Sequence, residues 1–428
     1  MKIQKSTGLT PFGGINFVLE ELEDLGIGRM LNNHLAPLGS PSRYDWKDLV
    51  YSFWSVILCG GDCIEDIGGN FRSYLQGMPW MKIPSPDRIL ARFKELSGER
   101  EHPSSPRGTQ GHDFSFHQVL CQLNLMLLKK TGGLQKSGGV LDYDNTYLFN
   151  DKADSRYTYK KANGYCPGVG LLDGRVVFIQ NRNGNSGAHT FQSRTLERMF
   201  DQLREQGVGV EAFRADSASY QMDVIETVDR NVERFYIRAR MNAPLAEAIS
   251  NIDNWVDIGT GQMRGDIPFT PFGNTARKQG EPERLKTYRL VVTKEPRNDG
   301  QINLFTGEAC CYWAILTNDQ VMDNDRTVDF YNQRGAMEKE FDVLKNDFNW
   351  NRMPFSKLEQ NTVFLYLSAM CRNIYGYIIR KFSAKFKILR ATDRLKKFIY
   401  RFITLPAKWT RHSRQMVLRI YGDIPLRE

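Results

Sequence analysis

Residues 208–240 read VGVEAFRADSASYQMDVIETVDRNVERFYIRAR, and this stretch decides the fold class. Its first part, 208–215, alternates like a strand, 218–231 carries apolar residues at helical spacing, and 234–240 alternates again. A strand, a helix and a second strand in succession are typical of α/β proteins. Working outward, we expect the same core to include one more helix and two more strands, at 116–130, 139–143 and 175–180.

The rest of the chain divides around this core by composition. Residues 14–35 and 46–58 carry helical periodicity, and Ser85-Pro86 predicts the start of a further helix. The stretch 99–112 is rich in Pro, Gly, Ser and charge, which indicates an exposed linker. Alternating runs at 287–293 and 310–317 predict a mainly β insertion, and helices follow from Asp325 through Phe402. We therefore expect five regions: a helical N-terminal region with its linker, the first part of the α/β core, a β-rich insertion, the second part of the core and a basic helical C-terminal region. Their bounds are 1–112, 113–242, 243–320, 321–378 and 379–428 respectively.

The composition is that of a globular protein that stays in water. Of the 428 residues 41% are hydrophobic and 25% charged, which excludes a disordered or collagenous chain. The apolar stretch 363–371 falls far short of the about 20 residues that cross a bilayer. The seven cysteines form an odd set without a CxxC pair, so we expect reduced thiols and a cytoplasmic protein.

The positive charge is concentrated at the C-terminal end. The chain carries 58 Lys and Arg against 49 Asp and Glu, but residues 380–428 alone hold fourteen against three, a net charge of +11. Basic side chains alternate there with apolar ones, so we expect an apolar stripe to dock on the protein while the basic side chains face out. Such a surface favours a polyanion, above all the phosphates of DNA, and a membrane surface is the weaker alternative. The lysines concerned are Lys385, Lys387, Lys396 and Lys397.

Four polar side chains share one face of the helix expected after Asp325. Tyr331, Arg334, Glu338 and Lys345 follow one another at steps of three, four and seven, which places them within about 60° of each other on an α-helix. A solvated helix face often mixes charges in this way. Asp342 is a rival carboxylate on the same face, and Glu340 points away.

Further carboxylates stand where strands end. Asp142 and Asp144 lie on the same side of one strand by the period-two rule, and Asp216 follows another strand directly. Ligand sites of α/β sheets lie at the carboxyl ends of strands, although an isolated strand-end Asp is more often a turn or cap residue.

Three carboxylates without His or Cys fit two-metal phosphoryl transfer, because Mg²⁺ prefers oxygen ligands and two ions can activate water and neutralise the leaving oxygen. The chain has no GxxxxGK[ST] motif, which disfavours a P-loop ATPase. A glycosidase could use paired carboxylates but has no evident need for a basic tail. Zinc hydrolysis is disfavoured because the histidines are scattered, at 34, 102, 112, 117, 189 and 412.

These residues carry a resemblance to a known family. The spacing of Tyr331, Arg334, Glu338 and Lys345 matches the Y-x2-R-x3-E-x6-K signature of the DDE transposases of bacterial insertion sequences, in their group one branch. The segments 141–146 and 214–217 resemble the family's first and second Asp motifs, and 8–14 and 414–419 are similar to one branch of it. Many relatives have a glycine or a histidine–glycine pair after the first motif, whereas this chain has the sequence Tyr-Leu-Phe-Asn at 147–150.

The resemblance implies a ribonuclease H-like catalytic core at 113–242 and 321–378, interrupted by the β insertion within the 122 residues from Asp216 to Glu338. It also implies that the helical N-terminal region, 1–112, binds DNA. It further implies that Asp144, Asp216 and Glu338 bind two Mg²⁺ ions, for which Mn²⁺ substitutes, with Asp142 as the alternative to Asp144. By the same resemblance the DNA contacts are Tyr331, Arg334 and Lys345, together with Arg214 of the second motif.

The expected function is that of a transposase. It would bind the terminal inverted repeats of its element as a homodimer on paired ends, cleave the DNA and join it to target DNA, near the bacterial nucleoid and away from membranes. Related enzymes flip a base onto a Trp of the insertion domain; Trp313 is the candidate, with Trp255 behind it, and the alternative is a core strand Trp. Two other functions stay open: a transposase-derived DNA-binding protein without cleavage activity, and a metal-dependent nuclease.

Overall fold

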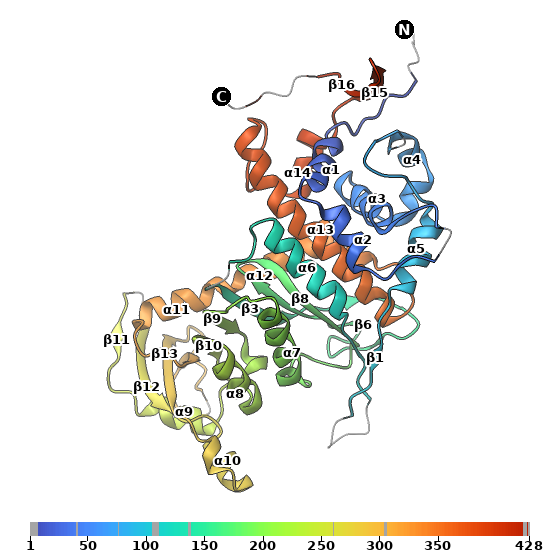
Figure 1. Cartoon of the computed structure of the whole chain (residues 1–428). Helices are drawn as coiled ribbons and strands as arrows, with labels where there is room; N and C mark the ends of the chain where they lie inside the picture. The colour runs from blue at the N-terminus through green and yellow to red at the C-terminus, as the bar shows by residue number, and fades with distance from the viewer. Residues whose placement is uncertain are drawn as a thin grey trace.

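The computed structural model has a helical part above a large twisted sheet, with a smaller β-rich part at the far end (Figure 1). One contiguous hydrophobic core runs from the N-terminal helices through the sheet. The structure describes residues 7–39, 42–75, 77–104, 111–135, 138–259, 261–303, 306–422 and 426.

Five helices form the N-terminal part. The helix expected at 14–35 is two helices, because Gly26 adopts a left-handed conformation with φ of 66° between them. The helix predicted to start at Pro86 is confirmed, and the Ser85 hydroxyl caps it by accepting from the backbone N–H of Arg88. The five helices are α1 (Ile15–Asp24), α2 (Ile27–His34), α3 (Trp46–Leu58), α4 (Asn70–Leu75) and α5 (Pro86–Glu95).

The central sheet has 11 strands in the order β1-β2-β8-β7-β3-β9-β10-β14-β13-β12-β11. Strand β9 is parallel to both β3 and β10, and the other pairings are antiparallel. This agrees with the expected α/β class. The first part of the sheet comprises β1 (Arg100–Glu101), β2 (Phe114–Ser115), β3 (Val140–Asn145), β7 (Gly168–Leu172), β8 (Arg175–Arg182), β9 (Ala212–Ala215) and β10 (Arg234–Arg238).

Helices cover this sheet and join it to the N-terminal part. Helix α13 (Leu358–Lys385) packs against both β8 and α6 (Gln118–Lys130), and the indole N–H of Trp54 on α3 donates to the carbonyl of Leu367 on α13. Helices α7 (Gln192–Glu205) and α8 (Met222–Asn231) pack against each other beside β9 and β10 (Figure 1).

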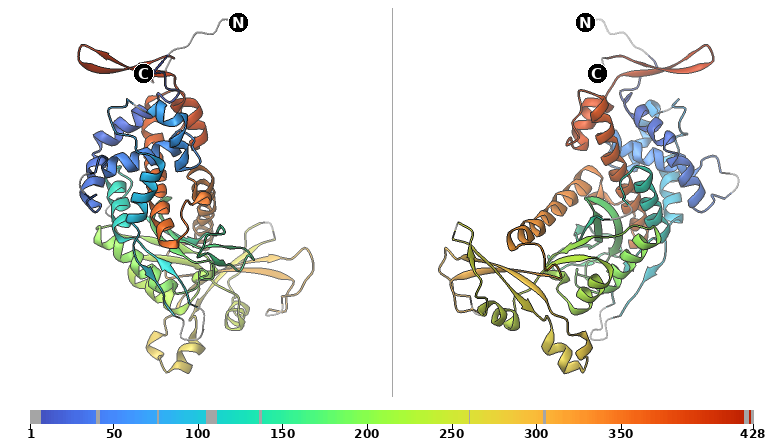
Figure 2. Two further views of the ribbon diagram at one scale, coloured as in Figure 1. Left: turned by 90° about the vertical axis from the view of Figure 1, so that its right-hand side faces the viewer. Right: turned by 60° about the vertical axis from the view of Figure 1, so that its left-hand side comes forward.

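The β-rich residues after 243 continue the same sheet. Strand β10 pairs with β14, so the expected insertion extends the core sheet instead of forming a separate one. Figure 2 shows this part projecting away from the helical end. It contains β11 (Val256–Asp257), β12 (Met263–Phe269), β13 (Tyr288–Pro296) and β14 (Cys310–Thr317), with helices α9 (Ala243–Ser250) and α10 (Gly273–Gln279). Helices α11 (Asn324–Asn332) and α12 (Ala336–Asp347) follow.

The prediction of a wholly helical C-terminal region is wrong for residues 407–420. After α14 (Leu395–Phe398) and a π-helical turn at Ile399–Ile403, the chain forms a hairpin of β15 (Ala407–His412) and β16 (Gln415–Ile420), which stands off one end of the molecule in Figure 2. Thr10 and Ala407 exchange backbone hydrogen bonds there. A Cβ on Gly14 would lie 1.9 Å from the carbonyl oxygen of Phe402, so this close backbone approach requires glycine.

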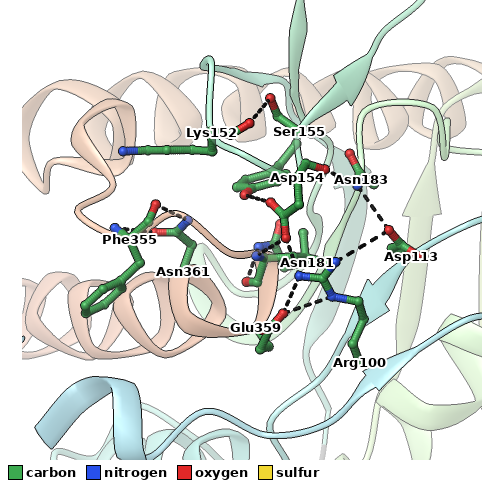
Figure 3. A network of polar contacts seen from close by, with 12 residues as sticks. Arg100, Asp113, Lys152, Asp154, Ser155, Asn181, Asn183, Phe355, Glu359 and Asn361 are labelled. Atoms are coloured by element: carbon green, nitrogen blue, oxygen red, sulfur yellow. Dashed lines mark hydrogen bonds and ion pairs between the residues drawn. The ribbon is translucent and has the colours of Figure 1, made fainter. Parts of the chain in front are cut away.

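The expected exposed linker at 99–112 is instead tied to the protein at both described ends. Strand β1 pairs with β2, and Arg100 forms ion pairs with Asp113, Asp154 and Glu359 (Figure 3). His112 is buried, and residues 105–110 lie outside the described part. The same network anchors a small separate sheet of β4 (Leu148–Phe149), β6 (Asn163–Tyr165) and β5 (Arg156–Tyr157).

Candidate active site

Two strand-end carboxylates meet because their strands are parallel neighbours. Tyr143 on β3 is paired with Ala215 on β9. The residues that follow them, Asp144 and Asp216, therefore lie at the same edge of the sheet. One oxygen of Asp216 accepts from the backbone N–H of Ala218 at 3.0 Å, which caps the short turn that follows the strand. The sequence prediction that both acids lie at carboxyl ends of strands is confirmed.

The surroundings of the Asp144 carboxyl disfavour its ionised form. Burial and the charge of Asp216 raise its pKa from 3.8 to about 6, while Arg334, whose Nη1 lies 3.1 Å from Oδ2 of Asp144, opposes the shift. Two acids close enough to raise a pKa, facing one guanidinium, form a site that favours added positive charge.

Asp142 has different surroundings. Its two oxygens accept from Nε and Nη2 of Arg214 at 2.7 and 2.8 Å, and both side chains are buried. The third nitrogen of Arg214 donates to the carbonyl oxygen of Phe330 at 2.6 Å. This pairing argues against Asp142 as the first metal-binding acid and against the DNA contact predicted for Arg214, because both groups already have their partners in the protein interior.

The helix that carries the four-residue signature is interrupted. Residues Gln333–Gly335 form a 3-10 turn between α11 and α12, so the prediction of one continuous α-helix is wrong there. Arg334 lies in that turn and reaches Asp144, whereas Glu338, in the first turn of α12, is exposed. Of the other acids of α12, Glu340 is paired with Arg372 and the rival Asp342 with Arg394.

Of the other two members of the signature, Tyr331 is buried and Lys345 is half-buried. Burial raises the pKa of Tyr331, against the opposing charge of Arg334. Burial also lowers the pKa of Lys345, and nearby Cys166 and Asp342 oppose that shift. Cys166 also interacts with Asp144, so Lys345 and Asp144 have this neighbour in common.

The donor set fits a divalent metal ion in part. Asp144 and Asp216 supply the adjacent oxygen ligands that Mg²⁺ prefers, and their mutual repulsion would be relieved by a cation. The Glu338 side chain does not lie with them: within the described residues no three His, Cys, Asp or Glu side chains are grouped so that they could hold one ion. Completing the predicted three-acid set therefore requires the Glu338 side chain to approach the other two acids.

A hollow of about 280 Å³ opens beside Tyr331, and Trp313 lines it. The indole of Trp313 is 37% exposed, so the alternative that it is a core strand Trp is wrong. Trp255, the second candidate, is half-buried and absent from the lining. The polar groups around the hollow include Arg238, Gln262, Arg264, Thr293 and Glu295.

Sequence reasoning missed the two arginines of this hollow. Arg238 ends β10 and Arg264 lies on β12. In the sequence, each is an ordinary charged position in a strand with alternating polarity. The Nε of Arg264 is buried and has no hydrogen-bond partner in the protein, while its Nη1 donates to Asp325 at 2.7 Å. Only the pairing of β10 with β14 and of β12 with β13 brings these side chains to Trp313, so no local signal could have found them.

No helix in the described ranges is both long and apolar enough to cross a bilayer. All seven cysteines are free, as the sequence predicts.

Three comparisons relate the chain to known proteins. The curated proteins give no match. Among solved structures, the piggyBac transposase synaptic complex with hairpin DNA aligns at 12% identity and a TM-score of 0.44, covering 93% of this chain and 82% of that one. The Drosophila P element transposase strand transfer complex aligns at 11% identity and a TM-score of 0.25, covering 85% and 87%. The family described as transposase DDE domain group 1 matches residues 134–428, more than half of the sequence and all of the candidate active site, and the chain therefore belongs to that transposase family.

Proposed function

We propose that the protein binds the terminal inverted repeats of a mobile element, cleaves the DNA at those ends and joins the freed 3′ hydroxyl to target DNA. Family membership supports a transposase. The observation that carries the cleavage chemistry is the pair of adjacent carboxylates, Asp144 and Asp216, which faces Arg334 at the carboxyl ends of two parallel strands.

In this proposal Asp144 and Asp216 hold Mg²⁺, or Mn²⁺ in its place, and Glu338 completes a two-ion site. When bound, the ions polarise the scissile phosphate and lower the pKa of water. Arg334, which pairs with Asp144 in the structure, would be free to hold a DNA phosphate in a bidentate manner with its planar guanidinium once a cation balances that carboxylate. Lys345 and the Tyr331 hydroxyl supply further contacts to phosphate oxygens.

The hollow at Trp313 fits one extruded base. An exposed indole offers a stacking face, and Arg238, Arg264 and Gln262 supply hydrogen-bond donors around it. Its position beside Tyr331 would place the extruded base next to the cleaved strand.

Specific binding also needs contacts away from the cut. The C-terminal lysines Lys385, Lys387, Lys396 and Lys397 are all exposed, and apolar residues between them, such as Phe386 and Leu395, are buried, as the sequence predicts. We propose that this surface holds DNA phosphates, that the N-terminal helices take part in binding, and that two copies act on paired ends near the bacterial nucleoid.

Two alternatives make different predictions. A transposase-derived DNA-binding protein would bind the ends without cutting, and the unassembled position of Glu338 favours keeping this candidate. A metal-dependent nuclease would cut without recognising ends and without joining strands.

The test begins with the DNA that flanks the coding sequence, where matched inverted repeats define the substrate. Duplexes that end in those repeats are incubated with the full chain and Mg²⁺, and nicks and joined products are resolved on denaturing gels. Cleavage at the repeat boundary that disappears in EDTA and in Asp144→Asn is the expected result. Binding without cleavage would establish the first alternative, and cleavage of unrelated duplexes at equal rates the second.

A further inference from the structure

A group of aromatic side chains follows directly after Asp144 and faces solvent. Phe149, Tyr157 and Tyr159 are 52%, 62% and 70% exposed. Tyr147 joins Phe149 and Tyr159 into one surface: its ring lies parallel to that of Phe149, with centroids 6.1 Å apart, and edge-on to that of Tyr159 at 5.2 Å. Tyr157 precedes Tyr159 by two residues. Exposed aromatic rings gathered in this way mark a binding surface, because scattered single ones are the normal case in soluble proteins.

The surroundings of these rings are basic. Residues 147–163 contain Lys152, Arg156, Lys160 and Lys161 against Asp151 and Asp154, and the carboxylate of Asp154 is already paired with Arg100. The Lys160 ammonium lies over the ring of Tyr159, 4.8 Å from its centroid. An apolar protein surface would pair with the rings but not with the positive charges. A nucleic-acid strand supplies phosphates for the cations and bases for the rings.

The rings sit on a rigid support. They belong to the small sheet β4–β6–β5 and the turn that closes it, where Thr158 and Ala162 are hydrogen-bonded. A Cβ at Gly164 would lie 2.5 Å from a backbone oxygen of Leu148, and one at Gly184 would lie 2.3 Å from that of Arg156, so the sheet lies tightly against the end of β8.

The polar network of Figure 3 fixes the loop between β4 and β5. Asp154 accepts from Arg100 and from the backbone N–H of Leu358, and its own carbonyl accepts from Asn183. Ser155 donates to the carbonyl oxygens of Asn150 and Lys152. A loop held at this many points keeps the aromatic side chains in place and lowers the entropy lost on binding.

The surface is also close to the proposed cutting site. Tyr147 is three residues from Asp144, a chain length of at most about 11 Å. Burial raises the pKa of Tyr147, and the hydroxyl of Tyr159 and the Asp144 carboxylate add to that shift, so Tyr147 lies between the acid and the exposed rings.

We propose that Tyr147, Phe149, Tyr157 and Tyr159 form a stacking platform for unpaired bases of a DNA strand next to the active site, with Lys160 and Lys161 holding its phosphates. The proposal rests on the proposed function, and it adds that the enzyme engages locally opened DNA through a second surface, separate from the hollow at Trp313. Stacking tolerates any base, so the platform would bind open strands without reading their sequence.

The experiment compares three fluorescent DNA probes in EDTA, which prevents cleavage: a single-stranded oligothymidylate, a duplex with a forked end, and the same duplex with blunt ends. Binding of the full chain is measured by fluorescence anisotropy. Phe149→Ala, Tyr157→Ala and Tyr159→Ala combined should weaken binding to the oligothymidylate and the fork about fivefold or more, the loss of at least one stacked base, and leave blunt duplex binding unchanged.

Matched variants separate stacking from other effects. Tyr157→Phe with Tyr159→Phe keeps the rings and should bind like the wild type, and Val321→Ala trims a 94% exposed apolar side chain elsewhere on the molecule and should have no effect. Should the triple variant fail to fold, Tyr159→Ala alone carries the same comparison, because this side chain is 70% exposed.

The failures are distinguishable. Equal binding of the triple variant and the wild type to the fork overturns the platform, whatever the wild type cleaves. A change in oligomeric state on size-exclusion chromatography, with unchanged fork binding, also overturns it and assigns the rings to a protein interface. A wild type that binds the fork through these rings but never cuts repeat ends leaves the platform standing and refutes the proposed function.

Discussion

Asp142 and Asp144 lie on one face of β3, but they have different partners. Asp142 pairs with the buried Arg214, whereas Asp144 faces Asp216 and Arg334. We expect Asp144→Asn, Asp216→Asn and Glu338→Gln each to abolish cleavage while leaving end binding intact, because each removes an anionic ligand with little change of shape. Cleavage in Mg²⁺ and Mn²⁺, with a binding measurement on the same ends, checks this.

Asp142→Asn is the matched control at the same strand. It leaves the buried guanidinium of Arg214 without its carboxylate, so the expected effect is a loss of about 3–5 kcal/mol in the free energy of unfolding. A stable but inactive Asp142→Asn protein, together with an active Asp144→Asn protein, would show that the first acid is Asp142.

Asp144 also makes a pH prediction for the metal-free protein. Its folded pKa of about 6 lies above the ordinary 3.8, so the folded state binds this proton more tightly than the unfolded chain does. The resulting stabilisation is complete below about pH 4 and is lost as the pH rises through about 6, by up to about 3 kcal/mol.

Urea unfolding in EDTA at pH 4.5 and 7.5 measures this effect against Asp144→Asn, which cannot titrate. The variant should gain stability relative to the wild type as the pH rises. Parallel curves would mean that burial and the charge of Asp216 do not raise the pKa of Asp144 in solution.

At the scale of single residues, the sequence predicted where the acids lie but not which side chain each of them contacts. The period-two rule brought Asp142 and Asp144 to one face, but only the pairing of β3 with β9 gives Arg214 to Asp142 and Asp216 to Asp144. Register between distant strands decides the partner of each acid, and a single strand carries no information about it.

At the scale of elements, the 3-10 turn before α12 explains why Glu338 stands apart. Each 3-10 residue advances about 120° instead of 100°, so the three residues Gln333–Gly335 rotate α12 by about 60° relative to α11. The face predicted to hold all four signature residues is therefore split. Sequence periodicity assumed one regular helix and gave no sign of the turn.

The hollow formed by β10, β12, β14 and α11 supports a prediction about Trp313. If an extruded base stacks there, Trp313→Ala should slow strand processing after the first nick and leave initial end binding nearly unchanged, since one stack contributes about 1–3 kcal/mol. Kinetics with pre-nicked ends isolate the later step. An equal loss in end binding would instead make Trp313 part of initial recognition.

At the scale of the whole molecule, the basic C-terminal surface predicts salt-dependent binding. Replacing Lys385, Lys387, Lys396 and Lys397 by Gln should weaken specific and nonspecific DNA binding alike and flatten the plot of log K against log salt, by about 0.9 per lost phosphate contact. Sequence preference should survive, because contacts to phosphates carry no sequence information. An unchanged slope with normal affinity would show that these lysines face solvent or a second copy.

The α/β core and its order of elements could be predicted because strand and helix periodicities are local. The hairpin at 407–420 could not, since Ala407 is fixed by its pairing with Thr10 at the other end of the chain. Likewise, the β-rich insertion was expected, but its fusion with the core sheet depends on the contact between β10 and β14, far apart in sequence.

The N-terminal helices can complete their packing only after α13, which lies late in the chain, has been synthesised. The hydrogen bond from Trp54 to Leu367 spans 313 residues, and Phe53 packs on Phe364 beside it. At about 5–20 residues per second, a ribosome needs roughly 15–60 s between making α3 and making its partner. During that interval the part of α3 that packs on α13 is uncovered, although α1, α2 and α5 already cover the rest. We therefore expect the nascent N-terminal helices to bind chaperones until α13 emerges.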